Sequence, residues 1–406
     1  MRTILHCDMN NFFASVESID KPELKAVPMA VCGRVEDRKG IVLAKNELAK
    51  ACGVSTGDAI WQAKAKCKNL VTVEPHFPQY MEYSKKAFEI YSRFTDQIEP
   101  FGIDECWLDV TGSLRLFGSG VEIADKLRGI MKSELGLTIS VGVSFNKVFA
   151  KLGSDLKKPD AVTEITADNF KEKIWDLPAE YMLNVGRATL KKLHQYHIVT
   201  IGDIADRDEA FLVRLLGVNG SFLKSAAMGL NDTPVNPNAA NRVSKSIGNS
   251  TTCVKDLSSS DEVWRIMLML SQTVCGRLRR EELCAYGVQI SVKNSSFETK
   301  MFQKRMITPI RSSQKLAKEG FALFLEHYDW AKNVRAIGIC AIQLEKWEGF
   351  RQENFFDSTD ELETLEKVDE AVDSLENRFG KGVVSPLSIK IPLNIPDQSN
   401  KPSFFH

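Results

Sequence analysis

Long apolar runs are missing from this sequence of 406 residues. No segment reaches the roughly 18 apolar residues that a membrane-spanning helix requires. The opening MRTILHCDMNNFFASVES has only a short apolar run, which His6 interrupts and Asp8 ends, so it lacks the pattern of a signal peptide. These absences predict a cytoplasmic protein that does not bind a membrane.

Paired cysteines are also missing. The nine cysteines are scattered, and none forms a C-x-x-C pair. This pattern predicts reduced thiols in the core or on the surface, and it excludes a zinc site or a disulfide framework built on close pairs. His194 and His197 lie close together, but no third ligand is evident near them, so we expect no metal there.

A net charge is absent from the whole chain but present in its parts. The chain has 53 Lys+Arg and 53 Asp+Glu. Residues 241–346 carry 17 Lys+Arg against 10 Asp+Glu, whereas residues 347–406 carry 6 against 12. The basic part predicts contact with a polyanion, and the acidic part is better suited to hold a protein. On charge alone, an ordinary solvated surface explains the pattern equally well.

The first part of the chain alternates predicted strands and helices. Strands are expected at 4–8, 30–33, 41–45 and 102–113, and amphipathic helices at 80–98 and 120–136; 138–156 reads as a strand followed by a helix. Consecutive elements then deliver Asp8 and the pair Asp104–Glu105 at or near strands of one mixed sheet.

From about residue 166 the pattern becomes helical. Short helices are expected between turns at 183–188, 200–205 and 215–220, and the Asn- and Pro-rich segment 229–242 predicts a linker. Four strands and two helices should follow in the order strand–helix–strand–strand–helix–strand, which is typical of a small split βαβ domain. Arg277, Arg279 and Arg280 should form the solvated face of the first of these helices. Beyond Trp347 we expect one acidic helix, over 359–380.

Three carboxylates are candidates for chemistry. Asp104 and Glu105 are adjacent, and neighbouring strand residues point to opposite faces, so both can reach one site only if the strand ends or bends there. Gly102 makes such a bend plausible. With Asp8 they would supply oxygen ligands for Mg²⁺, and two ions ~3.5–4 Å apart can promote phosphoryl transfer. An isolated Asp-Glu pair is usually solvated, so the spacing alone does not decide between a metal site and three solvated acids.

Four motifs that follow one another along the chain favour the metal site over solvated acids. They are DMNNFFASVE (8–17), GIDECWLDVTG (102–112), VGVSFNKVFAKLGSDLKKPD (141–160) and KSIG (245–248). Together they resemble the Y-family DNA polymerases, in the bacterial DNA polymerase IV branch, over roughly residues 1–346.

The resemblance implies an α+β fold in a right-hand arrangement. A palm with a mixed sheet would hold the carboxylates, and small fingers would cover the nucleotide. A thumb with helix–hairpin–helix turns and a split βαβ domain, the little finger, would grip DNA. The implied bounds are 1–11 and 76–165 for the palm, 12–75 for the fingers, 166–233 for the thumb, 234–241 for a linker, 242–346 for the little finger and 347–406 for an acidic tail.

The resemblance also assigns roles at the active site. Asp8, Asp104 and Glu105, with the carbonyl of Met9, would bind two Mg²⁺ ions. Phe13 falls at the position of the steric gate, a ring that collides with a 2′-hydroxyl and so favours deoxynucleotides. Core packing is the competing interpretation for Phe12 and Phe13, and Phe12 can pack as well as bind nucleotide. Lys158, in KKPD, matches the triphosphate-binding lysine.

One departure from the family pattern concerns the triphosphate. The family usually has Tyr and Arg three residues apart, where this chain has Glu47 and Lys50, and Asn11 replaces another frequent Tyr. Lys50 can still supply positive charge, but Glu47 would repel phosphate and is expected to turn away or to bind a cation. Asn11 and Lys50 remain the expected nucleotide contacts.

Further contacts are implied along the chain. Gly186 and Gly217 fit thumb turns that bind DNA phosphate through backbone N–H groups, and Asn184 stands where a second glycine is frequent. Arg242, Lys245 and Arg335 lie at strand starts of the little finger, where the family meets backbone phosphates.

A short segment after the little finger implies a protein partner. RQENFFDS (351–358) resembles the peptide that binds the bacterial sliding clamp, through Gln352, Phe355 and Phe356, although Glu353 stands where an apolar residue is common. Packing of the two rings on the protein itself is the alternative.

The sequence therefore predicts a monomeric, magnesium-dependent DNA polymerase. It would add deoxynucleotides to a primer opposite damaged or undamaged template, and no segment resembles a proofreading exonuclease. The runner-up is a catalytically weak DNA-binding accessory protein on the same scaffold, favoured by the Glu47–Lys50 departure. A nucleotide cyclase built on a similar palm does not account for the thumb and the basic module.

Overall fold

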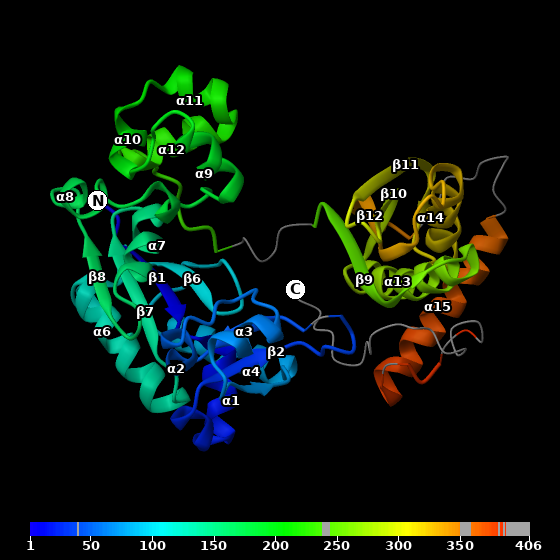
Figure 1. Ribbon diagram of the computed structural model, residues 1–406, viewed down its shortest axis with the longest axis horizontal. Coiled ribbons are helices and arrows are strands. Elements are labelled where there is room, and N and C mark those ends of the chain that lie inside the picture. Colours follow the sequence, from blue (N-terminus) through cyan, green and yellow to red (C-terminus); the bar gives the residue numbers. More distant parts are fainter. Residues whose placement is uncertain (39, 238–243, 350–358, 381, 385, 387–406) are drawn as a thin grey trace. The chain divides into compact units, whose positions relative to one another are not determined.

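The computed structural model describes residues 1–38, 40–237, 244–349, 359–380, 382–384 and 386. These residues form two compact units: residues 1–32 with 42–237, and the described residues of 33–41 with those of 244–386 (Figure 1). Within the described ranges, no helix is both long and apolar enough to span a membrane. All nine cysteines are free thiols.

A five-stranded mixed sheet is the centre of the first unit. Its order is β5-β6-β1-β7-β8, in which β1 pairs antiparallel with β6 and β7, while β7 and β8 are parallel. The strands are β1 (Ile4–Met9), β5 (Ile98–Pro100), β6 (Glu105–Asp109), β7 (Ile139–Ser144) and β8 (Val162–Ile165). The sheet thus brings β1 and β6, which carry the predicted carboxylates, next to each other.

Helices cover both faces of this sheet. Residues of α1, α4 and α6 pack with Leu5 and Cys7 in one core, whereas α7 lies against β1, β7 and β8. Gly142 permits this contact, because a Cβ there would lie 1.8 Å from the carbonyl oxygen of Ala150 on α7. The helices are α1 (Phe12–Asp20), α4 (Phe77–Tyr91), α5 (Leu114–Phe117), α6 (Gly120–Ile130), which continues as a π-helical turn (Met131–Leu135), and α7 (Lys147–Leu156).

A smaller sheet lies between α1 and α4 in the sequence. Its order is β3-β2-β4, and it packs with two short helices around a separate apolar cluster. The elements are a 3₁₀ helix (Pro22–Ala26), β2 (Met29–Cys32), β3 (Val42–Lys45), α2 (Glu47–Ala51), α3 (Ile60–Lys66) and β4 (Val71–Val73).

A helical segment completes the first unit. It consists of α8 (Phe170–Ile174), a 3₁₀ turn (Ala179–Tyr181), α9 (Arg187–His194), α10 (Ile201–Asp206), α11 (Glu209–Leu216) and α12 (Val218–Ala227). The prediction of a turn over 200–205 was wrong, because α10 occupies this stretch. Thr200 caps the helix: its Oγ1 accepts from the Asp203 N–H at 3.1 Å, and the Asp203 carboxylate accepts from the Thr200 N–H at 2.8 Å.

The second unit contains a four-stranded antiparallel sheet of order β11-β10-β12-β9. Its elements confirm the predicted strand–helix–strand–strand–helix–strand order. They are β9 (Ser246–Leu257), α13 (Ser260–Arg280), β10 (Leu283–Asn294), β11 (Thr299–Ile310), α14 (Ser313–His327) and β12 (Val334–Lys346). Both helices share one core with Ile290 and Ile339, so they cover the same face of the sheet.

The predicted acidic helix is α15 (Thr359–Phe379), and it packs on α13 and α14. Arg279 holds it there, with Nε donating to Asp373 Oδ2 at 2.6 Å and Nη1 to Asp369 Oδ2 at 3.3 Å. Only 7% of the Arg279 side chain is exposed, so its predicted place on a solvated face was wrong. The partners lie 90 or more residues further along the chain, beyond the reach of local helix periodicity.

Candidate active site

The register of β1 and β6 brings two predicted carboxylates together. Asp8 lies directly opposite Glu105, so their side chains share one face of the sheet. Asp104 precedes β6, in the bend that begins near Gly102, and its carbonyl accepts from the Met9 N–H at 2.9 Å. The bend places the Asp104 carboxylate close enough to Asp8 and Glu105 for their charges to shift its pKa.

Two lysines contact these carboxylates. Lys158 Nζ lies 2.7 Å from Asp8 Oδ2 and 2.8 Å from Asp155, and Lys151 Nζ lies 2.6 Å from Glu105 Oε2. In the described part of the chain, no three His, Cys, Asp or Glu side chains are grouped as a ready metal site. The Asp8 and Glu105 carboxylates are therefore engaged by ammonium groups in this arrangement.

The pKa values show how the charges compete. Burial, together with the charges of Asp8 and Glu105, raises the pKa of Asp104 to about 6. Burial also raises the pKa of Asp8, although Lys158 opposes it. For Glu105, the effect of burial is outweighed by the nearby His6 ring and by the hydrogen bond and charge of Lys151, which together lower its pKa to about 2. The site holds more negative charge than its two lysines balance.

Sequence reasoning missed His6 and Lys151. His6 is fully buried, its Nδ1 lies 2.8 Å from Ser154 Oγ, and its Nε2 lies 3.5 Å from Glu105 Oε2. Burial lowers the pKa of His6. The i, i+4, i+7 spacing of Lys147, Lys151 and Ser154 was a usable signal, because it puts all three on one face of α7.

Aromatic rings line the start of α1. Phe12 is 3% exposed and belongs to the core, which favours the packing interpretation for its ring. Phe13 is half-buried and stacks on Tyr80, with centroids 4.3 Å apart and planes at 13°. Asn11, before them, adopts a left-handed conformation with φ 50°. This turn lets the chain pass directly from β1 into α1.

The residues that depart from the family pattern contact one another. Asn11 Nδ2 donates to Glu47 Oε1 at 2.8 Å, and Lys50 Nζ lies 3.6 Å from Glu47 Oε2. The Lys50 side chain is half exposed, and Asn46 caps α2 beside it by accepting from the Ala49 N–H at 3.0 Å. Glu47 therefore binds a cation, one of the two outcomes predicted for it.

Known proteins match both units of this chain. The impB/mucB/samB family model matches residues 7–155, and the model of that family's C-terminal domain matches residues 244–355. DNA polymerase IV of Acetivibrio thermocellus is 48% identical over 379 residues, covering 93% of this chain and 95% of that protein. The chain belongs to the DNA polymerase IV branch of the Y family. DNA polymerase IV 1 of Bacillus subtilis is also similar, at 35% identity over 94% of this chain and 92% of that protein.

A solved structure supports the fold of this Y-family member. A Y-family DNA polymerase chimera matches with a TM-score of 0.75 and 23% identity, over 85% of this chain and 99% of the chimera. The predicted α+β polymerase fold is therefore confirmed.

The residues predicted to contact DNA differ in their position in the fold and in their neighbours. Gly186 precedes α9, and Gly217 joins α11 to α12 with φ 64°; Asn184 has φ 70°, the positive value expected for a residue standing in for glycine. Lys245 is exposed, whereas Arg335 lies 3.9 Å from Asp256 and 4.5 Å from the Phe297 ring centre. Arg242, Gln352, Phe355 and Phe356 lie outside the described residues.

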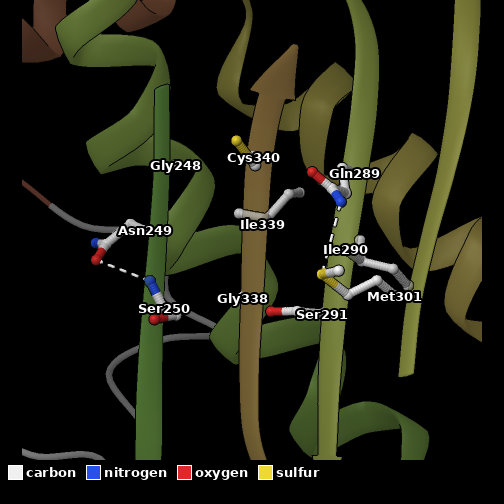
Figure 2. A pocket seen from close by; sticks show the side chains of 10 residues that line it. All are labelled: Gly248, Asn249, Ser250, Gln289, Ile290, Ser291, Met301, Gly338, Ile339 and Cys340. Carbon is white, nitrogen blue, oxygen red and sulfur yellow. Dashed lines mark hydrogen bonds between the residues drawn. The ribbon is translucent and has the colours of Figure 1, made fainter. Parts of the chain in front are cut away.

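The sheet of the second unit has an open face lined by small residues. Register places Ser250 opposite Gly338 and Gly338 opposite Ser291, on the face away from the core residues Ile290 and Ile339. A pocket of about 340 Å³ lies there, and Figure 2 shows the Gln289 amide contacting Met301 at its edge. A Cβ at Gly338 would lie 2.6 Å from Ser291 Oγ, so this face stays hollow only with glycine there.

Proposed function

We propose that this polymerase adds deoxynucleotides to the 3′-hydroxyl of a DNA primer, opposite damaged or undamaged template. The hydroxyl oxygen forms a bond to the α-phosphorus of the nucleotide, and the bond to pyrophosphate breaks. The observation that carries the proposal is the meeting of Asp8, Asp104 and Glu105 at one end of the sheet, in a chain of this family.

The donor set fits two Mg²⁺ ions. Carboxylate oxygens and the Met9 carbonyl are the hard ligands that Mg²⁺ prefers. Burial, and then the negative charges of Asp8 and Glu105, raise the pKa of Asp104, and bound cations would offset the contribution of those charges. We expect Asp8, Asp104, Glu105 and the Met9 carbonyl to hold both ions. When bound, the ions supply activation of the primer hydroxyl and neutralisation of the triphosphate.

Lys158 is proposed to bind the incoming triphosphate. Its ammonium group rests on Asp8 at 2.7 Å and can exchange that partner for a phosphate oxygen. Asn11 and Lys50 are proposed to complete the nucleotide contacts. Glu47 contacts both side chains and so holds them close to each other. Phe12 would act from the core, by supporting the position of Phe13.

Phe13 is proposed as the steric gate. Its ring is half-buried at the start of α1, four residues beyond the end of β1, and Tyr80 covers one of its faces. A fixed flat ring under the sugar would collide with a 2′-hydroxyl. Deoxynucleotides are then preferred because a ribonucleotide cannot bind without displacing the ring.

The remaining elements are proposed to hold primer–template DNA. The five-stranded sheet would be the palm, the three-stranded sheet the fingers, α8–α12 the thumb and β9–β12 with their helices the little finger. Backbone N–H groups near Gly186 and Gly217 would bind phosphate without reading sequence. The hollow face of the four-stranded sheet would admit the DNA backbone, with Lys245 and Arg335 supplying charge.

A partner and a state of assembly complete the proposal. We propose that the polymerase works as a monomer and binds the bacterial sliding clamp through Gln352, Phe355 and Phe356. The support is the sequence pattern and the acidic charge around it. The alternative of a catalytically weak accessory protein is not favoured, because such a protein has no use for three crowded carboxylates.

Primer extension with Mg²⁺, on undamaged template and on template with a defined lesion, tests the proposal. Wild type should extend both, and Glu105→Ala should extend neither while binding primer–template normally by fluorescence anisotropy. Asp109→Asn, on the same strand, is the matched control and should extend both, since Asp109 lies at the other end of β6, where its carboxylate accepts from Thr111. Extension by Glu105→Ala at the wild-type rate would contradict the assignment.

A further inference from the structure

A buried acid lies outside the carboxylate cluster. Glu17, on α1, is 3% exposed, and burying a carboxylate is costly unless hydrogen bonds satisfy it. Its oxygens receive a hydrogen bond from the Tyr80 hydroxyl and lie 2.8 and 3.0 Å from His76 Nδ1. These contacts join α1 to the beginning of α4.

The Tyr80 side chain carries this contact to Phe13. Tyr80 is fully buried, and its ring is parallel to that of Phe13. The His76 N–H donates to the Tyr80 oxygen at 3.1 Å, while Glu17 accepts the hydroxyl proton, so the oxygen is held from two directions. Burial and the Glu17 contact both raise the pKa of Tyr80, so the hydroxyl remains a donor.

We propose that Glu17 is a positioning residue for sugar selection, which fixes the Tyr80 ring by a hydrogen bond and thereby fixes the plane of Phe13. The proposal rests on the proposed role of Phe13 as the steric gate. A gate excludes one extra oxygen atom only if its ring cannot retreat. Phe77 restrains Phe13 from a second direction, edge-on at 5.9 Å, so the ring has a stacking partner and an edge partner.

A matched pair of substitutions tests the hydrogen bond. Tyr80→Phe removes only the hydroxyl that Glu17 holds. Tyr91→Phe removes an equally buried hydroxyl from the same helix, and that hydroxyl has no hydrogen-bond partner among the described residues. The readout is the ratio of kcat/KM for a deoxynucleotide to that for the matching ribonucleotide. A general loss of folding lowers both values together and leaves the ratio unchanged.

The expected result is specific to the held hydroxyl. Tyr80→Phe and Glu17→Met, which has no acceptor for the hydroxyl, should each lower the ratio by about threefold or more, and Tyr80→Leu, which also removes the stacked ring, by about tenfold. Tyr91→Phe should leave it within about twofold. Phe13→Ala should lower it by itself, and adding Tyr80→Phe to Phe13→Ala should change nothing further, because the two residues act in series.

The failures can be told apart. No extension by wild type, or an unchanged ratio in Phe13→Ala, overturns the proposed function or its gate. If Phe13→Ala lowers the ratio while Tyr80→Phe and Glu17→Met do not, the inference about Glu17 alone is overturned. An equal fall in Tyr91→Phe also overturns it, since loss of core packing would then explain both. Melting temperatures of all variants identify any that do not fold, and Glu17→Met then decides in place of Tyr80→Phe.

Discussion

Charge is buried in both units of this polymerase, with opposite outcomes. Around Asp104, three carboxylates share two lysines, and the pKa of Asp104 is raised to about 6. Around Arg279, one guanidinium lies between Asp369 and Asp373, and Ser313 N–H adds a hydrogen bond to Asp369 at 2.7 Å. The first cluster keeps an excess of negative charge and can accept cations. The second leaves its cation fully partnered and holds two helices together.

Removing a carboxylate from the first cluster should have the largest effect. Asp104→Asn should lower primer extension by at least about a thousandfold, because a ligand is lost. Without metal at pH 7 it should also stabilise the protein by roughly 1–3 kcal/mol. The sign follows because a raised folded-state pKa means that the ionised Asp104 destabilises the fold. Chemical denaturation in EDTA measures this, and a less stable variant would show that the cluster is not strained.

Removing the cation from the second cluster should lower the stability of the protein, the reverse of the effect expected for Asp104→Asn. Arg279→Ala should destabilise the second unit by about 2–3 kcal/mol, since the partly exposed carboxylates of Asp369 and Asp373 lose a nearly buried partner. Arg280→Ala, at the exposed neighbouring position, should change stability by no more than about 0.5 kcal/mol. Thermal unfolding of the full chain measures both. Equal effects of the two substitutions would remove the distinction between the clusters.

Lys158 sharpens the comparison, because its partner is expected to change during the reaction. Lys158→Met should raise KM for the deoxynucleotide by about tenfold, with a smaller change in stability than Arg279→Ala. Lys157→Met, at the exposed residue before it, should leave KM unchanged. Steady-state kinetics decide the matter: a loss of stability with normal KM would make Lys158 a structural cation like Arg279.

The smallest expected effect concerns Lys245, an exposed residue just before β9 of the sheet whose open face is proposed to bind DNA. Lys245→Ala should reduce the slope of log affinity for DNA against log salt by about one, as one phosphate contact is lost. Lys318→Ala, on helix α14 of the opposite face, should leave the slope unchanged. Anisotropy titrations at several salt concentrations measure this, and a reduced slope only in the Lys318 variant would move the DNA to the helical face.

Much of the fold could be predicted, because local periodicity determines it. The strand that ends in Asp8 and the strand–helix order of the second unit follow from apolar spacing alone. The prediction of a turn over 200–205 was wrong because the capping pair Thr200 and Asp203, which begins α10, was overlooked. The prediction that Arg279 lies on a solvated face was wrong for a different reason. Its partners lie on α15, and only tertiary packing brings them near Arg279.

The candidate site was predictable where motifs carried it. Asp8 and Glu105 lie opposite each other on β1 and β6, and Asp104 lies in the bend before β6, while their joint role in one site stays a prediction. His6 and Lys151 were not identified, because their contacts depend on α7 lying across the sheet above β1. Spacing along α7 shows which residues share a face, but it does not show what that face meets.

Gly142 determines how closely α7 approaches the sheet, and it does so without any functional group. A methyl group at that position would overlap the Ala150 carbonyl, so α7 would have to lift away from β7. Lys151 and Ser154 belong to α7. If the helix moved away, the contact of Lys151 with Glu105 and that of Ser154 with His6 would be lost. A search for chemically reactive residues would pass over Gly142, yet this residue without a side chain sets the distance between the charges of α7 and the carboxylate of Glu105.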